Sequence, residues 1–217
     1  MKEDHSIPEI MNSREDLIEQ LKQKDVLRSE ELEKAFKKID RADFVLGDYV
    51  PEAYEDYPLP ILGDQTISQP TTVAFMLELL DPILGEKILD VGSGSGWTTA
   101  LLAEMVGKEG EVTGIEIVDE LVEMGQGNLK RYDYPQAGVY KSGEVEIPEN
   151  YYDKVLVSAT ISSNIPEHFI RSLKEDGLLV SPVGEAITQY KKQDGGLIEL
   201  KTFPGFVFVP YIYNVEE

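Results

Sequence analysis

The most constraining feature of this 217-residue sequence is a glycine-rich turn between an apolar strand and the start of a helical pattern. We expect the strand at residues 88–91, glycines at positions 92, 94 and 96 in the turn, and the helix from Trp97 onward. Because glycine has no Cβ, backbone N–H groups in such a turn can come close to a ligand, and the following helix N-terminus adds the positive end of a dipole. The turn therefore predicts a binding site for a nucleotide-type cofactor.

The spacing of the turn narrows the choice of cofactor. A dinucleotide fingerprint, Gly-x-Gly-x-x-Gly, needs its third glycine where Trp97 stands, so the sequence disfavours NAD. The run Gly-x-Gly-Ser-Gly after Asp90 instead resembles the first motif of S-adenosylmethionine-dependent methyltransferases. A tight turn in some other α/β protein is the alternative interpretation, because short motifs are weakly specific. The loop residues expected to bind S-adenosylmethionine are Gly92, Ser93, Gly94, Ser95 and Gly96.

Two acids, Asp90 and Glu116, are expected at the same site. Asp90 ends the strand before the turn, where its carboxylate can bind the cofactor, hold the loop by accepting from backbone N–H groups, or do both. Glu116 ends the next predicted strand, near the spacing at which a nucleotide fold places its ribose-binding acid. The alternative for Glu116 is an ordinary strand-end acid in a very acidic protein. We predict that Glu116 accepts from the ribose hydroxyls and that the adjacent Ile117 belongs to the cofactor site.

Downstream of the turn, β-branched runs alternate with helical patterns as far as residue 183. This alternation predicts an α/β fold with a doubly wound, mostly parallel sheet. The segments that alternate are 88–91, 97–106, 111–116, 120–130, 137–141, 154–159, 167–173 and 178–183. Three further strand-like segments predict antiparallel strands at one edge, with a hairpin turn at 194–196. These segments are 186–192, 197–203 and 207–213.

The region before the turn is expected to be mainly helical. Ser13 and Ser29 are candidate N-caps of two helices, and Pro70 suits the first turn of a third. Residues 48–64 have no sustained period and predict an irregular loop. We expect a flexible arm followed by one domain with a helical substrate-side segment, a cofactor-binding core and C-terminal strands. The corresponding ranges are 1–12 for the arm, 13–217 for the domain, and 13–85, 86–184 and 185–217 for its three segments.

Composition excludes several classes of function. With 41 acidic and 20 basic residues the formal charge is −21, so the chain repels phosphates and nucleic acid is an improbable partner. No apolar stretch approaches the roughly 20 residues that span a bilayer, and the N-terminus lacks the pattern of a secretory signal. The absence of cysteine and the presence of only two histidines argue against a metal site or a thiolate nucleophile. We therefore expect a cytoplasmic protein without metal, and we favour a monomer.

A second segment of interest, residues 65–70, carries four small polar side chains and leads into the helix that begins at Pro70. Orphan N–H groups, side-chain donors and the helix dipole all favour an anion at such a position, and a substrate carboxylate would fit there. The alternative is capping, in which Ser68 or Gln69 closes the helix and Pro70 occupies its first position. The residues alone leave these two interpretations open.

Six segments occur in the order typical of protein-L-isoaspartate O-methyltransferases, and the chain resembles that family over roughly residues 32–213. They are 40–45, 54–61, 65–70, 89–96, 181–184 and 208–211. The resemblance implies S-adenosylmethionine as cofactor, an isoaspartyl residue of a damaged protein or peptide as substrate, and a role in protein repair. It further implies Ser68 as the catalytic residue. The substrate-binding residues that it implies are Gln65, Thr66, Ile67, Gln69 and Val183.

Two departures from the family pattern generate alternative hypotheses. After the third strand of the core the family carries Gly-Asp-Gly, with an acid near the adenine of the cofactor, whereas this chain has Ser142, Gly143 and Glu144. We predict that Gly143 and Glu144 replace it. The turn at 158–166 lacks the family's glycine-rich sequence. An enzyme dedicated to one partner protein or peptide, and a non-catalytic binding module that retains the fold, are the alternatives to general isoaspartyl methylation.

Overall fold

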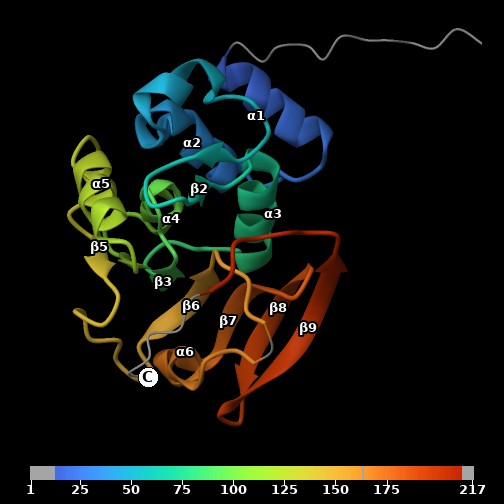
Figure 1. Ribbon diagram of the computed structural model, residues 1–217. Coiled ribbons are helices and arrows are strands. Elements are labelled where there is room, and N and C mark those ends of the chain that lie inside the picture. The colour runs from blue at the N-terminus through green and yellow to red at the C-terminus, as the bar shows by residue number, and fades with distance from the viewer. Residues whose placement is uncertain (1–12, 163, 212–217) are drawn as a thin grey trace, which may run out of the picture.

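The protein is built around a seven-stranded sheet, which Figure 1 shows below the N-terminal helices. The structure is a computed structural model that describes residues 13–162 and 164–211. The strand order is β5-β4-β3-β6-β7-β8-β9. The first five of these strands run parallel, and β8 and β9 are antiparallel additions. The strands span β3 Lys87–Val91, β4 Glu111–Glu116, β5 Ala137–Lys141, β6 Tyr152–Val157, β7 Leu173–Val183, β8 Ala186–Gln193 and β9 Gly196–Pro204. The predicted α/β fold with a mostly parallel sheet and antiparallel C-terminal strands is confirmed.

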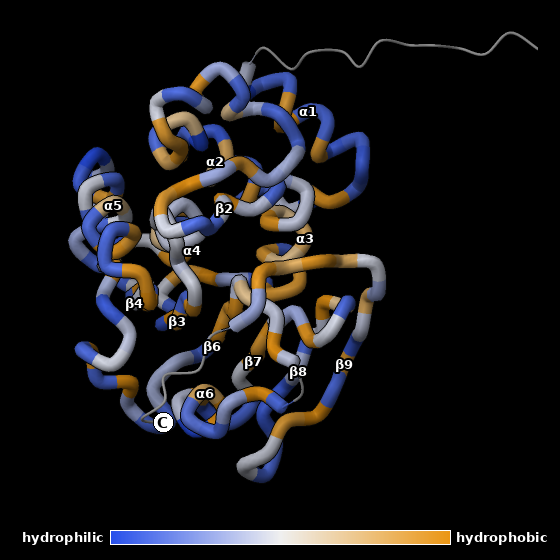
Figure 2. Tube along the Cα trace, viewed as in Figure 1, coloured by the Kyte–Doolittle hydropathy of each residue, from blue (hydrophilic) through white to orange (hydrophobic). Residues whose placement is uncertain are grey.

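The two faces of the sheet are covered by different helices. Alternate residues of a strand point to opposite faces, so Ile88 packs with the larger apolar cluster and Leu89 with the smaller one. The larger cluster joins the sheet to the first five helices, α1 to α5, and the smaller cluster joins it to α6. The helices span α1 Arg14–Gln23, α2 Glu30–Lys38, α3 Pro70–Leu80, α4 Trp97–Val106, α5 Asp119–Leu129 and α6 Glu167–Ser172. Figure 2 shows the apolar residues concentrated on the central strands and on the sides of the helices that face them.

The N-terminal helices begin where the capping signals predict. Ser13 accepts from the N–H of Asp16, and Ser29 accepts from the N–H of Leu32. Between α2 and α3 the chain forms two short 3-10 helices and a small antiparallel ribbon, in place of the fully irregular loop that we predicted. These are η1 Arg41–Phe44, η2 Gly47–Glu52, β1 Leu59–Pro60 and β2 Thr66–Ile67. The ribbon places the end of β2 directly before α3.

The cap of α3 comes from a distant side chain. Pro70 occupies the first position, as predicted, but the Gln69 side chain makes no capping hydrogen bond. The Asp56 carboxylate instead accepts from the N–H and the hydroxyl of Thr71, at 2.8 and 2.5 Å, and forms an ion pair with Lys24. The start of α3 is therefore closed without using Ser68.

Replacement of Asp56 by alanine is expected to destabilise the protein by about 1–3 kcal/mol, because it removes a helix cap and leaves Lys24 without its partner. Thermal unfolding followed by circular dichroism measures the change, with an expected fall in Tm of roughly 3–10 °C. Asp133→Ala at an exposed position serves as the matched control and should change stability by less than about 0.5 kcal/mol. Equal effects of the two substitutions would contradict the assigned cap.

The last predicted strand, 207–213, is wrong in the part that the structure describes. Residues 205–211 form a strap without regular strand pairing, apart from one parallel bridge between Pro210 and Thr160. Gly205 has a φ of +100°, and its N–H and that of Phe206 both donate to the Glu185 carbonyl, which turns the chain away from β9. Phe206 then stacks on Phe75 of α3, with ring centroids 5.4 Å apart. Packing against the helix therefore replaces a further strand pair.

Figure 2 shows this strap as an apolar run that crosses from β9 toward α3 and back over β6. Residues 212 and 213 and the predicted arm 1–12 lie outside the described residues. No helix in the described ranges is long and apolar enough to cross a lipid bilayer. Within the same ranges, no three or more acidic or histidine side chains are placed to hold a metal ion.

Candidate active site

A cavity of roughly 550 Å³ opens at the carboxyl ends of β3, β4 and β6. In an open α/β sheet this edge is where ligands bind, at the point where the strand order changes direction. The chain runs outward from β3 to β4 and β5 and then returns to β6 on the other side of β3. The residues that line the cavity are Pro58, Ile61, Gln65, Thr66, Ser68, Gln69, Thr72, Val91, Gly92, Gly94, Ile115, Glu116, Ile117, Leu121, Ser142, Ser158, Ala159, Val207, Phe208, Val209, Pro210 and Tyr211.

The glycine-rich turn forms one wall of the cavity. Gly92 and Gly94 line it directly, and the N–H groups of Gly92 and Ser93 both donate to the Ile115 carbonyl, which ties the turn to β4. Gly96 has a φ of +87°, and a Cβ at this position would lie 3.2 Å from the Cα of Gly125 in α5. The two glycines therefore have different roles. Gly94 lines the cavity with backbone atoms alone, and Gly96 lets α4 and α5 approach each other.

The remaining residues of the turn lie behind that wall. Ser93 and Ser95 are 4% and 2% exposed and border a second, smaller cavity of roughly 30 Å³. Neither of their hydroxyls has a hydrogen-bond partner among the described residues. The structure thus brings all five predicted loop residues together, but only the backbone near Gly92 and Gly94 lines the main cavity.

Glu116 holds the turn and lines the cavity at the same time. One carboxylate oxygen accepts from the N–H of Gly94 at 2.9 Å, and the other accepts from the N–H groups of Ile117 and Val118 at 2.7 and 3.0 Å. The side chain is only 6% exposed. A carboxylate has about four acceptor sites, so these three bonds leave capacity for a ligand hydroxyl. Glu116 is therefore not the ordinary exposed acid of the alternative interpretation.

Asp90 lies beneath the turn and does not line the cavity. It is fully buried, and one oxygen accepts from the hydroxyls of Thr98 and Thr99, both at 2.7 Å. The other oxygen has no partner among the described residues. Burial raises the pKa of Asp90 to about 6, against the two hydroxyl hydrogen bonds, and the charge of Glu116 adds to the rise. Asp90 holds the first turn of α4 through side chains, and it is Glu116 that accepts from a loop N–H.

The raised pKa of Asp90 predicts how stability depends on pH. The folded state binds the proton more tightly than the unfolded chain, so the stabilisation is full at low pH and is lost as the pH rises through about 6. Relative to Asp90→Asn, which cannot ionise, the wild type should lose up to about 3 kcal/mol of unfolding free energy between about pH 4 and 7. Urea unfolding of both proteins across this range measures the difference. A difference that stays constant with pH would contradict the prediction.

The predicted substrate-side element forms another part of the cavity wall. Gln65, Thr66, Ser68 and Gln69 line it, and Ile67 is buried in the core, where it borders the smaller cavity. Pairing of β1 with β2 holds this element in place.

The Ser68 side chain is half-buried, and among the described residues its hydroxyl makes no hydrogen bond. Capping by Ser68 or Gln69, one of the two interpretations left open by the sequence, does not occur. The Ser68 hydroxyl is therefore available to a ligand in the cavity.

Three further predicted site residues lie outside the cavity lining. Gly143 and Glu144 are exposed in the turn after β5, and the neighbouring Ser142 lines the cavity instead. The Ser142 N–H donates to the Glu116 carbonyl at 2.8 Å, which fixes the turn beside β4. Val183 ends β7 and bridges to Ile161, behind the turn that follows β6. The predicted Ile117 does line the cavity.

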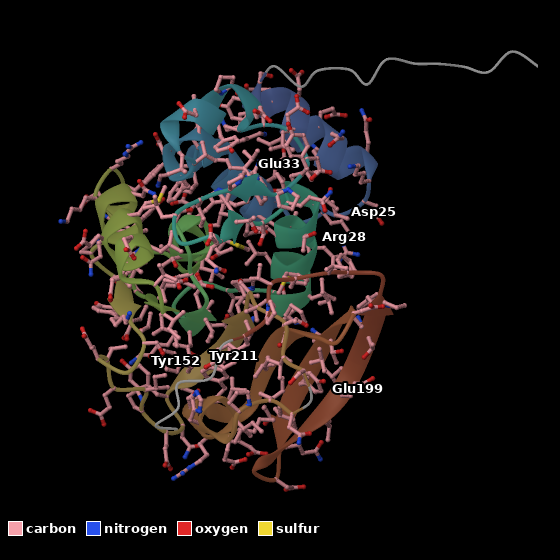
Figure 3. All side chains as sticks on the ribbon, in the orientation of Figure 1. Asp25, Arg28, Glu33, Tyr152, Glu199 and Tyr211 are labelled. Atoms are coloured by element: carbon pink, nitrogen blue, oxygen red, sulfur yellow. The ribbon has the colours of Figure 1, made fainter. Side chains whose placement is uncertain are left out.

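Sequence reasoning missed some of the residues that line the cavity. Residues 207–211 of the strap line one side of it. The N–H of Thr160 donates to the Val209 carbonyl and the N–H of Tyr211 donates to the Thr160 carbonyl, both at 2.8 Å, which holds the strap in place. Figure 3 labels Tyr211 at the end of this strap, close to the strands of the sheet. The family motif at 208–211 indicated that this segment matters, but its strand-like pattern predicted a further strand of the sheet and not a segment beside the cavity. Among the described lining residues only Glu116 carries a charged side chain.

A parallel sheet with a glycine-rich turn after β3, a buried acid at the end of β4 and a cavity at their carboxyl ends defines a Rossmann-like methyltransferase fold. A comparison with models of protein families shows which methyltransferase family the chain belongs to. The model of the protein-L-isoaspartate(D-aspartate) O-methyltransferase family matches residues 12–216, and the chain belongs to this family.

Archaeal relatives and solved structures agree with this assignment. Protein-L-isoaspartate O-methyltransferase of Methanopyrus kandleri is 38% identical, over 98% of this chain and 96% of the relative. Protein-L-isoaspartate O-methyltransferase 2 of Archaeoglobus fulgidus is 40% identical over 91% of each. A Plasmodium falciparum chain, assigned as a protein-L-isoaspartate O-methyltransferase and crystallised with S-adenosyl-L-homocysteine, matches with a TM-score of 0.80 and 25% identity, over 94% of this chain and 100% of that chain. A further structure of a protein-L-isoaspartate O-methyltransferase gives a TM-score of 0.81 and 26% identity, over 94% and 67%.

Proposed function

We propose that this protein methylates the free carboxylate of L-isoaspartyl residues in damaged proteins or peptides, with S-adenosylmethionine as methyl donor. The family and its relatives at 38–40% identity support this activity. The observation that carries the proposal is the arrangement of the cavity. Gly92, Gly94 and Glu116 line the same cavity as Gln65, Thr66, Ser68 and Gln69. A methyl donor and a carboxylate acceptor can therefore share one cavity.

The residues of the wall that the glycine-rich turn forms fit S-adenosylmethionine. Glu116 retains acceptor capacity for a ribose hydroxyl, and Gly94 lines the cavity with backbone atoms alone. Ile117, Leu121 and Ser142 extend this wall. When bound, the cofactor supplies an electrophilic methyl group on a sulfonium centre. Asp90 and Glu116 place negative charge near that cation.

The substrate needs orientation more than activation. A side-chain-type carboxyl with a pKa of about 4 is already ionised at neutral pH, so no general base is required, and none of the described lining residues is a histidine. The free hydroxyl of Ser68 can donate to one oxygen of the carboxylate and leave the other oxygen to attack. The strap, β3 and β4 contribute apolar residues to the lining, and a lining of low polarity strengthens the attraction between carboxylate and sulfonium.

Substitution Ser68→Ala tests this arrangement. We expect kcat/KM for an isoaspartyl peptide to fall roughly 10- to 100-fold, because a hydrogen bond to a charged group contributes about 1.5–3 kcal/mol. The affinity for S-adenosylmethionine should stay unchanged. Transfer of labelled methyl groups to the peptide measures the first quantity, and calorimetry measures the second. Ser162→Ala, at an exposed position outside the cavity lining, is the matched control.

The same assay separates the proposal from its two alternatives. Turnover of several unrelated isoaspartyl peptides by the wild type supports a general repair enzyme and counts against an enzyme dedicated to one partner. Absence of a methyl ester despite normal cofactor affinity would refute the isoaspartyl substrate. Absence of both turnover and cofactor affinity would support a non-catalytic module.

A monomeric state and a cytoplasmic location stay predictions from the sequence. The large cavity is lined by residues of a single chain, which supports a site that functions without a second copy. Sedimentation or light scattering measures the mass in solution, and a dimer would contradict the prediction.

A further inference from the structure

Arg41 is the most deeply buried cationic side chain near the substrate-side element. It lies in η1, is 2% exposed, and forms no ion pair with the described carboxylates. Its guanidinium donates to four backbone carbonyls instead. One terminal nitrogen donates to Ala53 and Glu55 at 2.9 and 3.0 Å, and the other donates to Tyr57 and Ser68 at 3.0 and 3.2 Å. The side chain therefore joins two separate segments of the chain.

The first of these segments carries the cap of α3. Asp56 lies between two of the carbonyls that Arg41 binds, and its own carboxylate accepts from Thr71. The second segment is the backbone of Ser68, in the wall of the cavity. By holding both, the guanidinium limits the positions that Ser68 can take relative to the first turn of α3.

The same guanidinium also lies over the ring of Trp97 in α4, the helix that follows the glycine-rich turn. Its central carbon is 5.4 Å from the centre of the Trp97 ring, and that ring also contacts Phe36 of α2 edge to face, at 5.7 Å between centroids. Trp97 is the first residue of α4, directly after Gly96. Arg41 thus contacts the backbone of Ser68, which lines the cavity, and the ring of Trp97, which borders the smaller cavity behind the glycine-rich turn.

We infer that Arg41 is a positioning residue that sets the distance between the methyl donor and the carboxylate acceptor. This inference rests on the proposed function. Methyl transfer requires the attacking oxygen, the methyl carbon and the sulfur to lie in line, and an error of about 1 Å in such an arrangement lowers the rate about a hundredfold. Arg41 touches neither reactant in this arrangement. It acts through the Ser68 backbone and the Trp97 ring.

The chemistry of the guanidinium suits this role. Its planar fork presents several donors in fixed directions, which one lysine ammonium cannot reproduce. Burial lowers the pKa of Arg41 to about 10, and the charge of Asp56 opposes the shift, so the group stays protonated at neutral pH. The hydrogen bonds therefore persist over the working range of the enzyme.

The test compares Arg41→Lys with Arg41→Met. We expect kcat for an isoaspartyl peptide to fall roughly 10- to 100-fold in both, because lysine retains the charge but loses the fork. KM for the peptide and the calorimetric affinity for S-adenosylmethionine should stay within about threefold of the wild type. Because a partly unfolded sample would also lower the apparent kcat, kcat is calculated per active site, with the fraction of active sites taken from the calorimetric stoichiometry.

Leu17→Ala in α1 is the matched control, because it removes buried volume in the same N-terminal layer and takes no part in the hydrogen bonds or the ring contact of Arg41. A loss of kcat in Leu17→Ala as large as in Arg41→Lys, at equal loss of Tm, would overturn the inference. So would an Arg41→Lys enzyme with kcat within threefold of the wild type.

If both Arg41 variants fail to fold, Trp97→Leu supplies the second measurement. It removes the ring beneath the guanidinium, and we expect kcat to fall at least tenfold while the peptide KM changes little. An unchanged kcat in a folded Trp97→Leu protein overturns the inference. Lack of turnover in the wild type, in contrast, refutes the proposed function itself, so the two failures are distinguishable.

Discussion

Substitution of Glu116 by alanine is expected to weaken the binding of S-adenosylmethionine about a hundredfold. The carboxylate is the only charged side chain among the described lining residues, and it also accepts from the N–H groups of Gly94, Ile117 and Val118. Its removal would lose the proposed hydrogen bond to a ribose hydroxyl and would release the turn. A charge-assisted hydrogen bond contributes roughly 1.5–3 kcal/mol, and a loss of about 3 kcal/mol corresponds to the expected factor.

Substitutions at two further glutamates show whether the loss of affinity is specific to Glu116. Glu123→Ala on the exposed side of α5 is the matched control and should leave the affinity within about threefold. Glu144→Ala tests the predicted replacement of the family's adenine-side acid. Since Glu144 lies outside the cavity lining, we expect little change. Trp97 is the only tryptophan in the sequence and borders the turn, so its fluorescence can report binding in parallel with calorimetry. An affinity that survives Glu116→Ala would contradict the assigned ribose site.

Substitution Gly96→Ala is expected to destabilise the protein by about 2–4 kcal/mol and to weaken cofactor binding. A side chain with φ of +87° is strained, and the new Cβ would meet the backbone of Gly125 at 3.2 and 3.3 Å. The contact is with backbone atoms of α5, which cannot rotate away as a flexible side chain can. Relief requires α4 and α5 to separate, and that separation would also move the glycine-rich turn.

The same helix supplies the matched control. Gly127 lies in α5 with no atom within 4 Å of an added Cβ, so Gly127→Ala should stabilise the protein by up to about 1 kcal/mol. Chemical unfolding of both variants gives the free energies, and titration with S-adenosylmethionine gives the affinities. A Gly96→Ala protein as stable as the wild type would contradict the close approach of the two helices.

Local signals sufficed for much of the fold. The spacing of β-branched runs predicted the strands from β3 to β9, and capping serines predicted the starts of α1 and α2. The hairpin at 194–196 forms as predicted, because Asp194 and Gly195 both take positive φ. These features depend on side chains a few residues apart, so the sequence contains them directly.

The predictions from the sequence were wrong or left open where contacts between distant segments decide the structure. The strand-like pattern of 207–211 does not decide between a further strand and a strap, and the contact of Phe206 with α3 decided it. The polar run before α3 left capping and anion binding open, and Asp56 settled the capping by taking the N–H of Thr71. Asp90 was expected to bind the cofactor, to accept from loop N–H groups, or to do both, yet it lies outside the cavity lining and one of its oxygens accepts from the hydroxyls of two threonines.

The sequence by itself determined the class of cofactor site, because a glycine-rich turn between a strand and a helix is a local device whose geometry follows from the missing Cβ atoms. It also determined the family, through motifs in a fixed order. Only the tertiary structure decided which atoms face the reaction. Glu116 accepts from a loop N–H, Ser68 has a free hydroxyl, and Arg41 contacts both the Ser68 backbone and the Trp97 ring. These outcomes depend on contacts between segments far apart in the chain, which no local pattern encodes.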